Sequence, residues 1–462
     1  MTELPDMCAV ELVAAYRSKM LSPVAVIDAV LDRVAAWDDR LCAFWLVHAD
    51  EARCAARESE ARWMAGAPLG PIDGVPVSLK ENLATKGHPV PMGTVATELV
   101  PAAKDAPCPA RIAEAGGIVI GKTTMPDYAM ASSGLSSFHR LSRNPWNLER
   151  TPGGSSAGAG TAGAAGMGAL HVGTDIGGSI RLPAGWCGLV GLKPSFGRVP
   201  IAPNFYGRAA GPMTRTVADT ALLMSVLSLP DARDPMCLPF EKIDWMALDI
   251  DVRGVRIGLQ LDAGVGLAVD PEIAVAVQAA GRLFEENGAI VEPVAPFMTR
   301  AMLDGLDDFW RMRFYSDTAS MSAERKAGIL PYIREWVDGA AGLSGERVYR
   351  GFAQMSAIRD AALAAQRGFD FILAPTAPCP PAPADWSGPT NDPARPFEHI
   401  GFTLPHNMSD QPSISVNCGY TSESLPIGLQ IAGHRFDDIG VLRMAHFFER
   451  IRPAQRPWPR FD

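Results

Sequence analysis

The sequence lacks the patterns that mark several large classes of protein. None of its eight cysteines forms a CxxC pair, and no cysteine–histidine cluster has zinc spacing, which excludes a common zinc module. It also has no apolar run of about 18 residues and no signal-like N-terminus, so we expect a cytoplasmic protein without a membrane partner. No metal and no other cofactor is predicted.

Positive charge is also in deficit. Lysine and arginine number 42 against 51 aspartates and glutamates, for a net charge of -9. This balance argues against a nucleic-acid partner, because phosphate backbones attract basic surfaces. Hydrophobic residues make up 47% of the chain and charged residues 20%, enough for a large buried core. The composition favours a folded enzyme with a small-molecule substrate.

Helix-like and strand-like segments alternate along the 462 residues. Residues 1–65 look helical, and Ser22-Pro23 has the form of a helix start. From residue 74 strand-like and helix-like segments alternate, which predicts an α/β fold with a parallel or mixed sheet. Residues 300–368 look mostly helical and carry many aromatic residues. No linker divides the chain, so we expect a single domain over residues 1–462, with residues 1–65 packed on it.

A glycine-rich segment, residues 153–178 with ten glycines, fits more than one motif. Gly158 to Gly163 reads GxGxxG, but a dinucleotide-binding fingerprint must follow a strand, and the preceding residues are polar and contain proline. Gly154 to Gly158 reads GxSxG, the nucleophile elbow of α/β-hydrolases, which also needs a strand before it. Both interpretations are therefore weak.

A third interpretation joins this segment to Gly177-Gly178-Ser179. Consecutive amides before Ser179 can converge on one point, as an oxyanion hole requires. The alternative is that both segments are turns with helix-capping serines. Ser155 and Ser179 lie 24 residues apart, and an upstream strand-like run ends in Lys80. Together these features favour a catalytic site.

At these residues the sequence resembles the amidase signature family, from about residue 5 to 452. The resemblance rests on residues 153–156, 173–181 and 188–194, with further matches at 74–82, 411–416 and 425–433. It implies a single large mixed β-sheet flanked by helices on both faces, with residues 300–368 as a helical insertion that lines the substrate pocket. One departure is Ala157, where the family often has glycine.

The resemblance also implies the roles of individual residues. Ser179 would be the nucleophile and Lys80 would be the base. Ser155 would follow a cis peptide bond and relay the proton between them. The oxyanion hole would be formed by the amides of Ile176, Gly177 and Gly178, and the site would be supported by Ser156, Asp175 and Arg181.

No histidine lies in the motif, so the base must be another group, and a lysine can serve if it is neutral. The pKa of Lys80 would have to fall by roughly 2 to 3 units from its usual value of about 10.4. Burial behind Val77 and Leu79 would lower it. We expect Lys80 to hydrogen-bond Ser155, and Ser155 to hydrogen-bond Ser179.

The candidate substrate pocket is apolar. Leu182 follows the nucleophile by three residues, and Met130, Phe138 and Trp310 are predicted to join it. Further candidates are Met125, Phe205, Tyr206 and Phe402. Such side chains favour an apolar or aromatic acyl group. The proline-rich residues 376–398 are expected to form a long ordered loop with a functional role.

Three functions remain open from the sequence. The main one is an amidohydrolase that cleaves the C–N bond of a small-molecule amide through a seryl acyl-enzyme, with esters or carbamates as further substrates and a homodimer left open. The alternative is the glutaminase (A) subunit of a tRNA-dependent amidotransferase complex, which would need protein partners and an ammonia channel. The third is an inactive scaffold, against which the complete triad argues.

Overall fold

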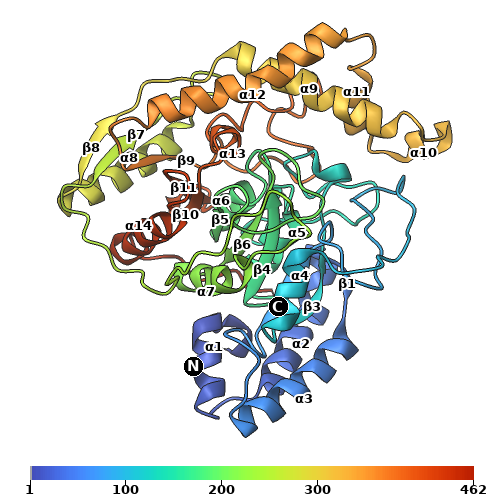
Figure 1. Cartoon of the computed structure of the whole chain (residues 1–462), viewed down its shortest axis with the longest axis vertical. Coiled ribbons are helices and arrows are strands. Elements are labelled where there is room, and N and C mark those ends of the chain that lie inside the picture. Colours follow the sequence, from blue (N-terminus) through green and yellow to red (C-terminus); the bar gives the residue numbers. More distant parts are fainter. Residues whose placement is uncertain (1–2, 462) are drawn as a thin grey trace.

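The computed structural model describes residues 3–461 and contains one mixed sheet of eleven strands (Figure 1). The strand order is β1-β3-β2-β4-β6-β5-β10-β11-β9-β7-β8. Parallel pairs are β2–β3, β2–β4, β7–β8 and β7–β9, and the other neighbours are antiparallel. The strands are β1 (Phe44–Val47), β2 (Pro76–Lys80), β3 (Ile118–Thr123), β4 (Leu170–Asp175), β5 (Val190–Lys193), β6 (Ala209–Thr214), β7 (Arg256–Leu259), β8 (Ile290–Pro293), β9 (Phe371–Pro375), β10 (Ser413–Tyr420) and β11 (Pro426–Gly433).

Helices connect the strands. They are α1 (Ala9–Arg17), α2 (Pro23–Leu41), α3 (Ala49–Ala65), α4 (Pro107–Glu114), α5 (Ala157–Ala165), α6 (Arg181–Cys187), α7 (Val217–Leu227), α8 (Pro271–Glu286), α9 (Arg300–Thr318), α10 (Ala323–Gly328), α11 (Pro331–Asp338), α12 (Gly345–Ala365), α13 (Leu404–Met408) and α14 (Asp438–Ile451). Two short 3₁₀ helices, Leu4–Asp6 and Asp127–Ala129, complete the set within the described residues. None of the helices described is long and apolar enough to cross a bilayer.

Helices cover both faces of the sheet, which confirms the predicted fold class. Strand β6 shows this directly, because side chains of a strand point alternately to its two faces. Ala210 packs in the main core with Leu223 of α7, whereas Met213 packs in a separate cluster with Ile180 and Ala184 at α6.

The N-terminal helices α1 to α3 lie at one end of the molecule and α9 to α12 at the other (Figure 1). Helix α2 begins as predicted, because the Ser22 hydroxyl accepts a hydrogen bond from the Val24 amide at 3.0 Å. The helical run of residues 1–65 is interrupted by β1, which pairs with β3. The division into a single domain with an insertion at 300–368 stays a prediction. All eight cysteines are free thiols.

Part of the glycine-rich segment forms a buried helix, α5. No strand immediately precedes it, so neither the dinucleotide fingerprint nor the α/β-hydrolase elbow has its required context. Glycine allows α5 to approach its neighbours closely. A Cβ on Gly158 would lie 2.1 Å from the Ala43 carbonyl oxygen and 2.5 Å from the Thr124 amide nitrogen.

We expect Gly158→Ala to destabilise the protein by about 1–3 kcal/mol, because backbone atoms of Ala43 and Thr124 leave no room for a methyl group. Calorimetric unfolding temperatures would measure this. Gly345→Ala is the matched control, since Gly345 begins α12 and no atom lies within 4 Å of its added Cβ. Equal unfolding temperatures for the two variants would contradict the close packing of α5.

Candidate active site

The predicted catalytic residues meet at the carboxyl ends of two neighbouring strands, β2 and β4. Lys80 ends β2, and Ser179 lies in the turn between β4 and α6. Strands β2 and β4 are parallel neighbours, so their carboxyl ends lie side by side. Ser155 comes just before α5, which packs over these strands. The sheet topology therefore brings together residues that lie about a hundred positions apart in the chain.

Lys80 and Ser155 form the predicted hydrogen bond. The Lys80 Nζ lies 2.8 Å from the Ser155 Oγ, and the peptide bond between Gly154 and Ser155 is cis. Both residues are buried: Lys80 has no exposed surface, and Ser155 is 1% exposed. The contact is thus shielded from bulk water.

The surroundings of Lys80 favour its neutral amine. Burial lowers the pKa of Lys80 well below its usual value, and the nearby Arg208 guanidinium lowers it further. Asp175 and Glu81 act in the opposite direction but less strongly. A neutral amine has a lone pair that can accept the Ser155 hydroxyl proton, as a general base must.

The second predicted hydrogen bond, between the hydroxyls of Ser155 and Ser179, is not formed in the described structure. Ser179 is held instead through its backbone, because its carbonyl accepts the Ser156 amide at 3.1 Å. The Ser179 side chain is partly exposed and lines the same cavity as Ser155. Catalytic hydrogen bonds are often long in the absence of substrate and shorten in the reacting complex.

One of the three predicted oxyanion amides has another partner. The Gly178 amide donates to Asp175 Oδ1 at 2.8 Å, whereas the amides of Ile176, Gly177 and Ser179 donate to no described residue. The backbone of Gly178 has a φ of +125°, and a Cβ there would lie 2.6 Å from the Thr403 hydroxyl. The amide donors available to an oxyanion are therefore those of Ile176, Gly177 and Ser179 itself.

Asp175 and Arg181 form a fully buried ion pair beneath this turn, at 2.8 Å. Burial alone would raise the pKa of Asp175, but the Arg181 charge and hydrogen bonds from Asn407 and the Ile180 amide hold it well below its usual range. The Arg181 guanidinium donates further to four groups, the Thr403 carbonyl, Ser413, Asn407 and Gln430. This network fixes the turn that carries Ser179.

Ser156 supports the same turn from the other side. Its hydroxyl donates to the Thr174 carbonyl at 3.3 Å and accepts from the Thr174 amide at 3.3 Å. Ser156 therefore joins the start of α5 to the end of β4. The predicted supporting residues all touch the backbone around Ser179.

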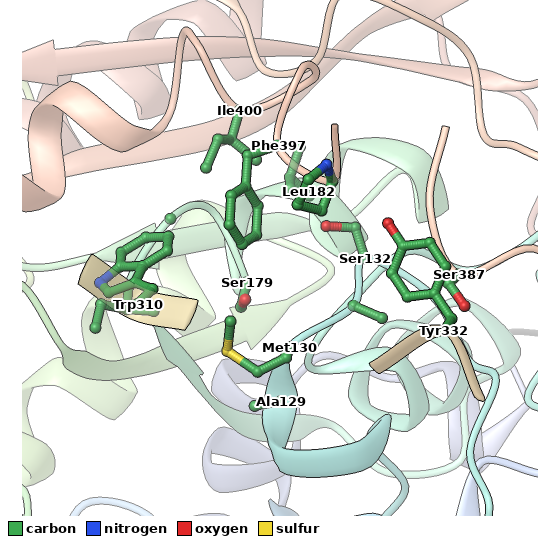
Figure 2. A pocket seen from close by; sticks show the side chains of 14 residues that line it. Ala129, Met130, Ser132, Ser179, Leu182, Trp310, Tyr332, Ser387, Phe397 and Ile400 are labelled. Carbon is green, nitrogen blue, oxygen red and sulfur yellow. The ribbon is translucent and has the colours of Figure 1, made fainter. Parts of the chain in front are cut away.

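A cavity without charged side chains, here called cavity A, opens beside Ser179 (Figure 2). The predicted residues Met130, Leu182 and Trp310 line it, and the Ser179 hydroxyl lies among Met130, Trp310 and Phe397. The lining contains no Asp, Glu, Lys, Arg or His side chain. Its other members are Ala129, Ala131, Ser132, Ile176, Gly177, Tyr332, Ser387, Pro396 and Ile400.

Phe138 was wrongly predicted to line the pocket. Its ring packs edge-on against Trp45 and His139, with centroids 5.9 and 4.9 Å away. The Ser136 hydroxyl accepts the amides of Phe138 and His139, and this tight turn directs the ring away from Ser179.

Of the other candidates, Phe205 lines a second cavity, whereas three lie outside both linings: Met125, Tyr206 and Phe402. Sequence reasoning missed Tyr332 of α11 and Ile400, since neither has a motif. It did expect a functional loop at 376–398, and Ser387 and Phe397 of this loop reach cavity A.

A larger space, cavity B, borders Ser179 on another side. Ser155, Asn82 and Thr174 line it near the catalytic residues. Unlike cavity A it contains charged side chains, namely Arg208, Arg313, Asp175 and Asp317. Burial and the neighbouring Arg313 charge lower the pKa of Arg208 to about 10, so Arg208 stays charged at neutral pH.

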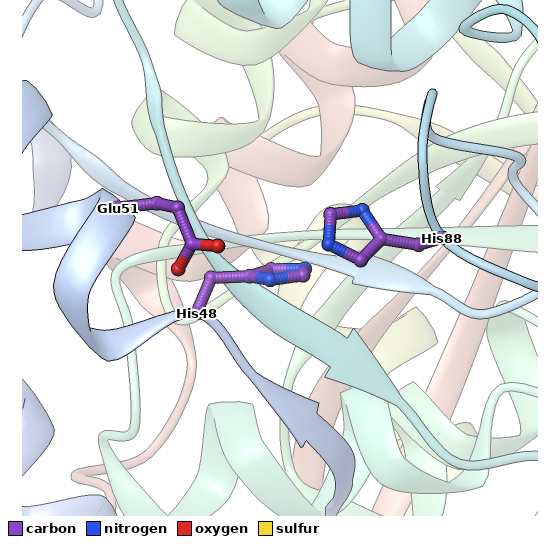
Figure 3. Close-up of side chains that lie close together, drawn as sticks. All are labelled: His48, Glu51 and His88. Atoms are coloured by element: carbon purple, nitrogen blue, oxygen red, sulfur yellow. The ribbon is translucent and has the colours of Figure 1, made fainter. Parts of the chain in front are cut away.

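His48, Glu51 and His88 form the one group in the described part of the chain with ligand atoms close enough to hold a metal ion (Figure 3). Their ligand atoms lie within 4.8 Å of one another, and Glu51 is exposed. None of the three lines cavity A or cavity B.

Comparison with known proteins agrees with this geometry. A family model described as Amidase matches residues 25–442. Two curated relatives, from Roseiflexus castenholzii and Myxococcus xanthus, are each named as the A subunit of a glutamyl-tRNA(Gln) amidotransferase. The alignment with the first is 34% identical and covers 93% of each chain. The alignment with the second is 35% identical and covers 97% of this chain and 98% of the relative. A solved bacterial aryl acylamidase of the amidase signature family is 33% identical, covers 97% of this chain and 96% of its own, and has a TM-score of 0.89.

The environment of Lys80 predicts a pH dependence. If neutral Lys80 is the base, kcat/KM falls as the pH drops through its pKa. Arg208→Gln removes a charge that lowers the pKa of Lys80, so this acid limb should shift to higher pH. A pH profile of kcat/KM with a neutral amide measures the shift, and Arg350→Gln, on the exposed side of α12, is the control. An unshifted limb would contradict the electrostatic role of Arg208.

Proposed function

Since this chain belongs to the amidase signature family and is an enzyme that acts on amide C–N bonds, we propose that its substrate is a small amide with an apolar or aromatic acyl group. The observation that carries the proposal is the charge-free lining of cavity A beside Ser179. Trp310 and Phe397 offer that acyl group two aromatic rings, 5.2 Å apart and nearly perpendicular. Apolar lining with few polar groups is typical of sites for such ligands.

In the proposed reaction Lys80 accepts the Ser155 hydroxyl proton as Ser155 accepts that of Ser179. The Ser179 Oγ then attacks the amide carbon, and the carbonyl oxygen becomes an oxyanion. The amides of Ile176, Gly177 and Ser179 are free to donate to it.

The same proton relay works in reverse when the C–N bond breaks. Ser155 donates a proton to the leaving nitrogen and is reprotonated by Lys80, which leaves Ser179 acylated. Water, deprotonated through the same pair, then attacks the acyl-enzyme and releases the acid. Esters and carbamates pass through a similar tetrahedral intermediate, so the same residues would also cleave them.

A second candidate is the glutaminase component of a tRNA-dependent amidotransferase. It is favoured by the names of the curated relatives, which align over almost the whole chain. Its substrate glutamine, however, carries an ammonium and a carboxylate group, which need charged or polar partners when buried. Cavity A has no ionised side chain to serve either. The geometry therefore favours the apolar amide.

The nucleophile has a direct test. We expect Ser179→Ala to lower kcat by about 10⁴-fold or more for any accepted amide, since a nucleophile acting with its base contributes that much. A fluorophosphonate probe should label the wild-type protein at Ser179 and leave the variant unlabelled, as seen by peptide mass spectrometry. Ser225→Ala, on α7, serves as the control. Near-wild-type turnover by Ser179→Ala would refute the assigned nucleophile.

The two candidate functions differ in substrate and in partners. We expect benzamide and anilides of benzoic acid to be hydrolysed with kcat/KM at least about tenfold above that for glutamine, because one unpaired buried charge costs that much or more. A hydrolysis panel with ammonia and aniline detection measures this. Preferred hydrolysis of glutamine, together with stable co-purification of partner proteins, would instead support the amidotransferase function.

A further inference from the structure

The two cavities at Ser179 differ in charge, and this difference bears on the part of the substrate that leaves as the amine. We propose that cavity B binds a carboxylate carried by the amine portion of the substrate, with Arg313 as the residue that selects it. The inference rests on the proposed function, because it assumes that Ser155 protonates the leaving nitrogen.

Cavity B is the side on which the amine must lie. The leaving nitrogen has to reach the Ser155 hydroxyl to be protonated, and Ser155 lines cavity B but not cavity A. Ser179 borders both cavities, so the scissile bond can lie between them. The acyl group then occupies cavity A and the amine portion occupies cavity B.

Arg313 has unused hydrogen-bonding capacity in this cavity. Its guanidinium lies over the rings of Phe205 and Phe314, at 4.2 and 4.5 Å from their centroids. It forms no ion pair within 4 Å and no hydrogen bond with any residue that the structure describes. Packing against these two rings orients the guanidinium group without using its N–H donors. These donors can therefore form hydrogen bonds to a carboxylate.

Arg208 adds a second positive charge to the same wall. Its Nη1 donates to the Pro203 carbonyl at 2.8 Å, and it makes no ion pair among the described residues. Arg208 and Arg313 both line cavity B, and the Arg313 charge lowers the pKa of Arg208. Two neighbouring guanidinium groups without a buried counter-charge favour binding of an anion.

The acidic groups of cavity B do not cancel this charge. Asp175 is neutralised by its buried ion pair with Arg181. The Asp317 carboxylate acts against the lowering of the Arg313 pKa by burial, but it is exposed to screening water and forms no ion pair with Arg313 within 4 Å. Lys80 does not line cavity B, so it adds nothing to the balance. Cavity B therefore has a net positive wall.

The chemical class of the substrate follows from these contacts. Phe205, Phe314 and Tyr128 supply apolar surface, and Arg313 supplies the charge, which together suit an aromatic or amino-acid amine with a carboxylate. The reaction consumes one water and yields the free acid from cavity A and the carboxylate-bearing amine from cavity B. No further reactant is required.

The test uses two benzoyl amides, one of para-aminobenzoate and one of the neutral para-nitroaniline, which has a similar shape. We expect Arg313→Gln to lower kcat/KM for the carboxylate substrate by about 10- to 100-fold, mainly through KM, and for the nitro substrate by less than about twofold. Comparing each substrate between variant and wild type cancels the different reactivity of the two amines.

Two further variants control for folding. Arg313→Lys keeps the positive charge and should restore part of the lost activity toward the carboxylate substrate. Arg350→Gln removes an arginine from the exposed side of α12 and should change neither substrate. Equal losses for both substrates in Arg313→Gln would show a merely structural role and overturn the inference.

Product binding separates this inference from the proposed function. Para-aminobenzoate should bind the wild-type protein more tightly than para-nitroaniline in calorimetry, and Arg313→Gln should abolish that preference. Hydrolysis of the nitro amide without any carboxylate preference would refute cavity B as an anion site but leave the proposed function intact. No hydrolysis of either amide, with selective binding of para-aminobenzoate, would refute the proposed function alone.

Discussion

The burial of Lys80 without a counter-ion is the constraint on which the rest of the site depends. A charged ammonium at this position would need several strong acceptors, and the one side-chain hydrogen bond that the structure provides is to Ser155 at 2.8 Å. The nearest acids are occupied, since Asp175 pairs with Arg181 and the Glu81 carboxylate lies 2.7 Å from His139. The fold therefore favours the neutral amine that a base requires.

The Asp175–Arg181 ion pair serves both the base and the nucleophile. Arg181 offsets the charge of Asp175, which raises the pKa of Lys80 less than burial lowers it. The Asp175 oxygens also accept the amides of Gly178 and Ile180 on either side of Ser179. The turn is thereby fixed, and the neighbouring amides stay free to bind an oxyanion. A buried ion pair that contributes little net stability can still be required for geometry.

The sequence predicted the parts of the site that depend on local chain order. Lys80, Ser155 and Ser179 lie in motifs or at the end of a strand-like run, and the resemblance to the amidase signature family implied that they meet. The hydrogen bond from the Gly178 amide to Asp175 was not foreseen, because it depends on the conformation of the turn. Helix α5 was missed because its glycines serve close packing rather than turns. The segments that carry Phe397 and Arg313 were expected near the site, but which of their side chains reach the cavities depends on tertiary packing.

The catalytic residues and the cavity walls come from different parts of the chain, which explains why close relatives need not share a substrate. The catalytic residues are held by β2, β4 and the start of α5, whereas the cavity walls also take residues from segments 128–132 and 203–208, from α9 and α11, and from the loop before α13. These wall segments can change without disturbing the hydrogen bonds that hold Lys80 and Ser179. A relative's name therefore informs the reaction that the sheet edge supports, while the side chains of the walls decide which acyl and amine groups can reach it.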